Sequence, residues 1–177
     1  MDRRFRRRRT RPPVFVLLLL ALVAVRLLMT QRDDPPPEAL HEGDYQVERV
    51  VDGDTLLLDN GARVRLQGID TPETVMPDHP IEPWGPEAAA FTRDFVAGGT
   101  VRLQLGLDRK DDYGRFLAFV WVEESLLNEE LVRVGLATAE QGFFYNPAMK
   151  RRLVAAEKEA QAARRGIWST DEGSTSE

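Results

Sequence analysis

Hydrophobic and polar residues alternate along much of the chain between residues 45 and 122, as is typical of strands with one buried face. In Val101–Leu107 every second residue is apolar. Arg115–Val122 is apolar on both faces after its first residue, which predicts a central strand. Three further strands are predicted at Tyr45–Val51, Thr55–Asp59 and Ala62–Ile69, giving five in all.

Three other segments carry helical periodicity and helix end signals. The first opens at Pro86 and ends at Gly98–Gly99, and the second covers roughly residues 128–134. The third has Asn146 as its cap and is expected to end at Gly166. Five short strands with three helices predict an α+β, mainly β domain, built as a closed or nearly closed barrel with helices packed on it.

Asn60-Gly61 lies between two predicted strands and favours a hairpin with a two-residue type I′ turn. Such a turn pairs Asp54 with Gln67 at the open end of the hairpin. A bend directly after Gln67 then returns Asp70 towards Asp54. Glu73 follows this turn, so the pattern predicts that two carboxylates, Arg65 and a third carboxylate converge on one small region.

Carboxylates brought together in this way repel one another unless a cation joins them. The chain has no cysteine and two histidines, so a cluster for zinc, iron or copper is excluded. A hard cation such as Ca²⁺ fits oxygen ligands. An alternative stays open, in which these acids only make a surface turn soluble.

The net charge of −5 is unevenly divided along the sequence. Residues 1–32 hold nine arginines and one aspartate, so the remainder carries −13. Seven of the arginines, in the basic segment 1–13, precede a short hydrophobic helix expected at residues 14–29. This order predicts an uncleaved membrane anchor or a cleaved export signal; a basic cytosolic tail that binds nucleic acid is a third interpretation.

Residues 30–44 are rich in proline and acids and read as a tether, while residues 169–177 are polar and expected to be disordered. The folded domain is therefore expected at 45–168. Because the arginines should stay cytoplasmic, the domain is expected outside the cytoplasm, anchored to the membrane or secreted after cleavage.

Six motifs occur in the order found in one known family. They are VVDGDT, VRLQGIDTPE, WGPEAAAFT, DDYGRFLAFVWV, LLNEELVRVGLA and EAQAARRGIW. Over residues 45–168 the chain resembles the thermonuclease family, the staphylococcal-nuclease-like domains. The resemblance implies a five-stranded OB-fold barrel with three helices, and a Ca²⁺-dependent phosphodiesterase that acts on DNA and RNA.

The resemblance also assigns roles. The metal ligands would be the carboxylates of Asp54 and Asp70 and the carbonyl of Thr71, with Glu73 as the general base and Arg65 and Arg115 as the phosphate-binding arginines. This set suits hydrolysis, because a base can activate water while bidentate guanidiniums neutralise the charge that develops on phosphorus. Arg115 has a second interpretation, which is an ion pair with Asp111 or Asp112.

The aromatic residues leave alternatives open. Tyr113 either stacks on a base or sugar or covers the barrel mouth. Phe143 and Tyr145 occupy the region where the family places base-stacking tyrosines, but core packing explains them equally well. The acidic exported portion and a lysine-free loop after Glu73 predict modest affinity for nucleic acid.

Two other functions are compatible with the sequence. One is a catalytically weak or silent barrel of the same fold that binds nucleic acid or a partner protein. The other is a structural module tethered to the membrane. We expect the nuclease domain itself to be a monomer.

Overall fold

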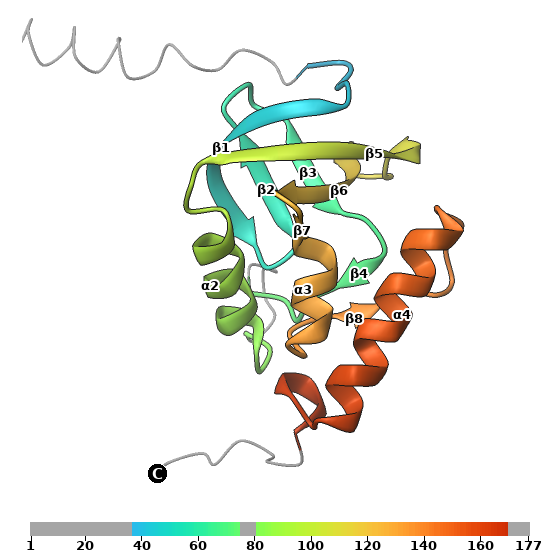
Figure 1. The fold of residues 1–177 in the computed structure, drawn as a ribbon. Coiled ribbons are helices and arrows are strands. Elements are labelled where there is room, and N and C mark those ends of the chain that lie inside the picture. Colours follow the sequence, from blue (N-terminus) through green and yellow to red (C-terminus); the bar gives the residue numbers. More distant parts are fainter. Residues whose placement is uncertain (1–36, 75–80, 170–177) are drawn as a thin grey trace, which may run out of the picture. The chain divides into compact units, whose positions relative to one another are not determined.

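The computed structural model describes residues 37–74 and 81–169, all within the compact unit Pro36–Glu177 (Figure 1). The predicted hydrophobic helix at 14–29 and the C-terminal segment from residue 170 lie outside the described residues. Within the described ranges, none of the helices combines the length and apolar character needed to cross a bilayer.

Five strands form a closed barrel, as predicted. They are β1 (Gly43–Asp52), β2 (Thr55–Leu58), β3 (Arg63–Leu66), β5 (Thr100–Lys110) and β6 (Phe116–Val122). The order is β3-β2-β1-β5-β6, and parallel pairing of β3 with β6 closes the ring. β6 is thus central, because β3 and β5 flank it and the short β7 (Ser125–Leu126) pairs with its end.

A second, two-stranded sheet continues the chain after the barrel hairpin. In it β4 (Ile69–Asp70) pairs with β8 (Thr138–Ala139), so Asp70 lies opposite Thr138. This pairing brings the segment after residue 138 next to the segment after β3. The loop after β8 and the segments on either side of β4 therefore lie side by side.

The barrel core explains the alternating pattern. Leu56, Val64, Leu103 and Phe119 are each at most 1% exposed. Leu40, upstream of the predicted domain start, is also buried against this core.

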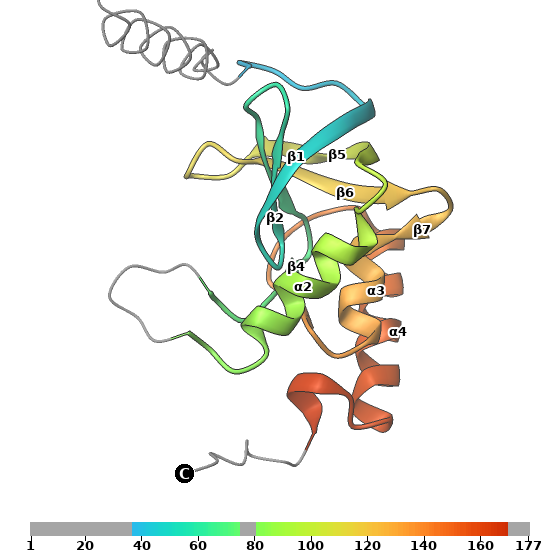
Figure 2. The ribbon, with the colours of Figure 1, turned by 90° about the vertical axis from the view of Figure 1, so that its left-hand side faces the viewer.

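The three predicted helices are present as α2 (Gly85–Phe95), α3 (Leu127–Arg133) and α4 (Pro147–Ala162), followed by a short 3₁₀ turn, η1 (Gly166–Trp168). They lie together below the barrel strands in both ribbon views (Figures 1 and 2). The Asn146 side chain caps α4 by accepting from the backbone N–H groups of Ala148 and Met149. The predicted end at Gly166 was wrong, because α4 ends at Ala162 and Arg164 adopts a left-handed conformation (φ 50°).

The predicted hairpin turn was wrong by one residue. Gly61 N–H donates to the Leu58 carbonyl and Leu58 N–H to the Ala62 carbonyl, so the loop has three residues. Gly61 has a positive φ of 79°, whereas Asn60 does not have the positive φ that a type I′ turn requires. The longer loop shifts the register, so Thr55 lies opposite Arg65.

Candidate functional site

Asp54 lies at the tight turn between β1 and β2 and is 6% exposed. One carboxylate oxygen accepts from the backbone N–H of Thr71 at 3.1 Å and from its hydroxyl at 2.9 Å. The other accepts from the Thr55 hydroxyl at 3.0 Å. The hairpin and the segment after β4 therefore meet at Asp54, as the sequence predicted.

One arginine joins the two predicted carboxylates. The observed register places Arg65 opposite Thr55, the neighbour of Asp54. Its guanidinium pairs with Asp54 and, at 2.7 Å, with the exposed Asp70. Burial lowers the pKa of Arg65, but Asp54, Asp70 and Glu140 raise it further, so that it stands above the ordinary value.

Glu73 follows this cluster on a segment tied to its surroundings. Its backbone N–H donates to the Glu82 carboxylate, and its carbonyl accepts from the Glu82 N–H, both at 3.0 Å. Burial, a hydrogen bond with Asp52 and the negative charges of Asp52, Asp54 and Asp70 raise the pKa of Glu73 to about 7. Glu73 therefore lies in an environment with excess negative charge.

The donor chemistry at this position fits a hard cation. All the candidate ligands are oxygen atoms, and burial together with the charges of Asp52, Asp54 and Asp70 raises the pKa of Glu73. Among residues 37–74 and 81–169, no three Asp, Glu, His or Cys side chains form a preformed metal cluster. The ligand set implied by the resemblance, which combines Asp54 and Asp70 with the backbone carbonyl of Thr71, stays a prediction.

Arg115 lies at the start of β6 and is held by Asp111. Its Nε is 2.7 Å from one Asp111 oxygen, and its backbone N–H donates to the other at 2.9 Å. The pair with Asp111, left open by the sequence, is thus present. Arg115 also lies over the Tyr113 ring, 5.4 Å from its centroid.

A cavity of about 290 Å³ has both Arg65 and Arg115 in its wall. The predicted substrate residues Tyr113, Phe143 and Tyr145 also line it. The structure thus gathers both phosphate-binding candidates and all three aromatic candidates around one space.

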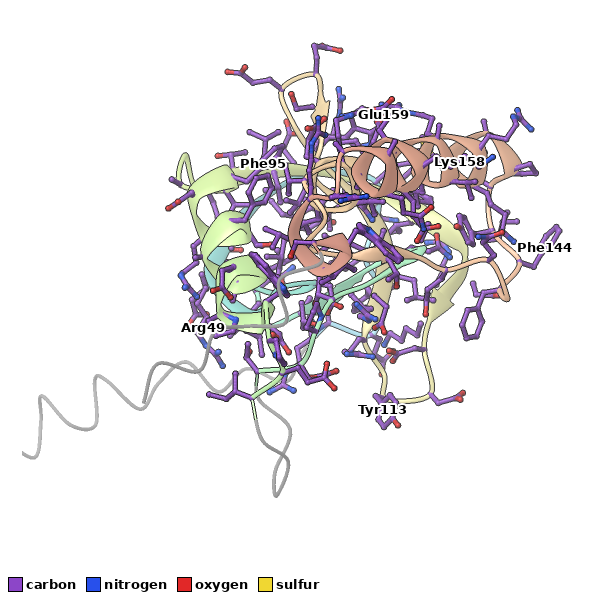
Figure 3. The ribbon with its side chains drawn as sticks, turned by 90° about the horizontal axis from the view of Figure 1, so that it is seen from below. Arg49, Phe95, Tyr113, Phe144, Lys158 and Glu159 are labelled. Atoms are coloured by element: carbon purple, nitrogen blue, oxygen red, sulfur yellow. The ribbon has the colours of Figure 1, made fainter. Side chains whose placement is uncertain are left out.

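The three aromatic residues differ in exposure. Tyr113 is 86% and Phe143 67% exposed, so both rings are available for stacking. Figure 3 shows Tyr113 and Phe144 projecting from two different loops. Tyr145 instead is 2% exposed, and its ring centroid lies 6.2 Å from that of Phe119. It therefore belongs to the core, at the wall of the cavity.

Two acidic residues near the site were not singled out from the sequence. Asp52 is 7% exposed and accepts from the Thr74 hydroxyl at 2.6 Å. Its position in the acidic sequence DGD, next to Asp54, could have indicated it from the sequence. Glu140 follows β8 and lines the cavity. Burial raises the pKa of Glu140, as do Asp70 and Asp54, against the lowering effect of Arg65.

Known proteins match this chain in sequence. A family model described as "Staphylococcal nuclease homologue" matches residues 63–170. A thermonuclease of Staphylococcus hyicus is 42% identical over 134 residues, covering 73% of this chain and 78% of the relative. A thermonuclease of Staphylococcus intermedius is 44% identical over 129 residues, covering 70% and 75%. Endonuclease YncB of Bacillus subtilis is 35% identical over 129 residues, covering 70% and 60%.

The closed five-stranded barrel with three helices defines an OB-fold domain. The family match covers more than half of the chain, and two relatives exceed 40% identity. The chain therefore belongs to the staphylococcal nuclease homologue family.

Proposed function

We propose that this protein, a nuclease of that family, hydrolyses phosphodiester bonds of DNA, RNA or both with Ca²⁺ as its cofactor. The observation that carries the proposal is the cluster in which Arg65 joins Asp54 and Asp70, and in which Glu73 has a pKa of about 7. A general base is most effective when its pKa lies near the working pH. In the metal-free protein the pKa of Glu73 lies in that range.

In this mechanism Glu73 takes the proton from the attacking water. Arg65 and Arg115 donate hydrogen bonds to the non-bridging oxygens of the phosphate, whose charge grows as phosphorus becomes five-coordinate. A guanidinium offers two parallel donors to such oxygens, whereas a lysine offers a point charge. Two arginines in the wall of one cavity support this assignment.

The cation would be held by Asp54, Asp70 and the carbonyl of Thr71. When bound, Ca²⁺ supplies a Lewis acid for a phosphoryl oxygen and charge neutralisation for the acids. Asp70 is 59% exposed and so is accessible to the ion, whereas Asp54 is fixed by the hydrogen bonds from Thr71 and Thr55. Arg65 would then exchange its carboxylate contacts for the phosphate.

The exposed rings of Tyr113 and Phe143 would stack on unpaired bases. Stacking needs single-stranded or frayed substrate, because paired bases present no free faces to a side chain. The acidic composition of residues 33–177 predicts modest affinity that depends strongly on the cation.

We further propose that residues 1–29 direct the domain across a membrane and either anchor it there or are cleaved. The support is the order of seven arginines followed by an apolar run. Fractionation of cells that produce the full-length chain tests this proposal. Recovery of the intact protein in the soluble cytosolic fraction would contradict it.

The main proposal is tested by incubating the full-length protein with single-stranded DNA and with RNA, in Ca²⁺ or in chelator. We expect cleavage in Ca²⁺ only, and losses of about 10²–10³ in rate for Glu73→Gln and Arg115→Ala. Exposed Glu124→Gln is the control for the substitution. Binding of nucleic acid without cleavage would instead support the silent barrel.

A further inference from the structure

The backbone of Glu73, the proposed general base, is held by a residue to which the mechanism assigns no role. Glu82, nine positions further along the chain, accepts the Glu73 backbone N–H through its Oε2 at 3.0 Å. The Glu82 backbone N–H donates in return to the Glu73 carbonyl at 3.0 Å. One residue therefore holds the peptide planes on both sides of the Glu73 Cα, and these planes set the direction in which the side chain leaves the backbone.

Glu82 is itself joined to the start of α2. Its carbonyl accepts from the N–H of Gly85, the first residue of the helix, at 3.1 Å. The helix start also touches the Glu73 segment directly. A Cβ added at Gly85 would lie 3.0 Å from the carbonyl oxygens of Pro72 and Glu73, so a residue without a side chain allows this approach. Glu82 therefore ties the base to a helix.

A second contact ties the same segment to the barrel. The Thr74 hydroxyl donates to Asp52, the last residue of β1, at 2.6 Å. This contact restrains the residue after Glu73 but provides no acceptor for the Glu73 N–H. Within the described part of the chain, the Glu82 carboxylate is the acceptor for that group.

The surroundings of Glu82 favour a role in positioning over one in the core. Its side chain is exposed and does not belong to the hydrophobic cluster. A charged acceptor makes a stronger hydrogen bond to a backbone N–H than a neutral one does. A general base must lie within hydrogen-bond reach of the water, and a misplacement of about 1 Å can cost about a hundredfold in rate.

We propose that Glu82 is a positioning residue, which holds Glu73 where it can take the proton from the attacking water. The inference rests on the proposed nuclease function and adds to it a residue that touches neither the substrate nor the cation. It implies a selective defect. Loss of the acceptor should slow the chemical step, whereas Arg65 and Arg115 should still bind the phosphate.

Substitutions at Glu82 separate the hydrogen bond from the charge. Glu82→Gln keeps an oxygen that can accept the Glu73 N–H, whereas Glu82→Ala and the larger Glu82→Leu keep none. We expect kcat to fall by about tenfold to a hundredfold in the Ala and Leu variants, with KM within about twofold of wild type. Glu82→Gln should keep kcat within about threefold of wild type, because a neutral acceptor retains most of the bond.

The experiment measures initial rates of cleavage of single-stranded DNA by the full-length protein in Ca²⁺, over a range of substrate concentrations. Glu87→Ala, at an exposed position in the first turn of α2, is the matched control and should behave as wild type. A double variant combines Glu82→Ala with Glu73→Gln. If Glu82 acts through Glu73, adding Glu82→Ala should slow Glu73→Gln by less than about twofold.

Three results would overturn the inference. One is a wild-type kcat in both Glu82→Ala and Glu82→Leu, and another is an equal loss in Glu82→Gln, which would assign the effect to charge. The third is the same fold loss from Glu82→Ala in the Glu73→Gln background as in wild type, which would mean that Glu82 acts on the fold and not on Glu73. An absence of cleavage by wild type in Ca²⁺ would contradict the proposed function instead, so the two failures are distinguishable.

Discussion

Arg65 Nη2 lies 2.7 Å from Asp70 Oδ1, and the same guanidinium pairs with Asp54. The arginine therefore occupies the space between two carboxylates that the sequence assigned to a metal. A cation bound at the proposed site would compete with this guanidinium for the same negative charge. Arg65 thus has two states in our account, one bound to the carboxylates and one bound to substrate.

Removing Arg65 should separate ion binding from catalysis. In Arg65→Gln the carboxylates lose a positive neighbour, so Ca²⁺ affinity should equal or exceed that of wild type. The hydrolysis rate should fall by about 10²–10³, because one phosphate donor is lost. Calorimetric Ca²⁺ titration and a rate assay measure the two effects. Arg63→Gln, at an exposed position of β3, is the matched control, and weaker Ca²⁺ binding by Arg65→Gln would contradict the competition.

Glu73 should make the stability of the Ca²⁺-free protein depend on pH. Its pKa rises from 4.5 to about 7 on folding, so the folded state holds this proton more tightly. The stabilisation from that proton is fully present below about pH 4.5 and is lost as the pH rises through about 7. The melting temperature in chelator should therefore fall as the pH rises towards 7. Glu73→Gln should remove the part of this fall that Glu73 causes. The exposed Glu48→Gln should retain it; an unchanged pH slope in Glu73→Gln would show that Glu73 is not the group responsible.

Tyr145 and Phe143 should respond differently to truncation. Tyr145→Ala removes a ring that is 2% exposed and should cost about 3–5 kcal/mol in the free energy of unfolding. Tyr145→Phe loses the hydrogen bond to the Glu140 carbonyl, at about 0.5–1.5 kcal/mol. Phe143→Ala should leave urea unfolding unchanged and raise KM for single-stranded DNA. Equal destabilisation by Tyr145→Ala and Phe143→Ala would refute the distinction between core and surface.

Asp111 should act as a positioning residue for Arg115. It accepts from the backbone N–H groups of Tyr113 and Arg115 and pairs with the Arg115 guanidinium. Asp111→Ala removes all three contacts, and we expect kcat/KM to fall by about tenfold to a hundredfold. Asp111→Asn keeps an oxygen for the backbone bonds and should lose less. Identical rates for the two variants would mean that the loop does not depend on these contacts.

Much of the fold followed from local sequence signals. Alternation at Leu103 and its neighbours defined a strand, and Asn146-Pro147 defined a helix start. The hairpin register did not follow, because Asn60-Gly61 suits both a type I′ turn and a three-residue loop with glycine in the left-handed region. In the barrel Leu56 lies opposite Val64, and the burial of both side chains is consistent with the second.

The grouping of the candidate residues was predictable where they lie close in sequence. Asp54, Arg65 and Asp70 belong to one hairpin and the turn that follows, so local geometry brings them together. Glu140 reaches the cavity that Arg65 lines because β8 pairs with β4. Such contacts arise from the tertiary fold, and no short pattern in the sequence indicates them.

Whether Asp54 and Asp70 share one ion can be measured by calorimetric titration of Ca²⁺ into wild type and Asp54→Asn. We predict one ion per wild-type chain and an affinity at least about tenfold lower in Asp54→Asn, since the variant loses a charged ligand. Exposed Asp44→Asn should bind as wild type does. Equal Ca²⁺ binding by Asp54→Asn and wild type would contradict a shared ion between Asp54 and Asp70.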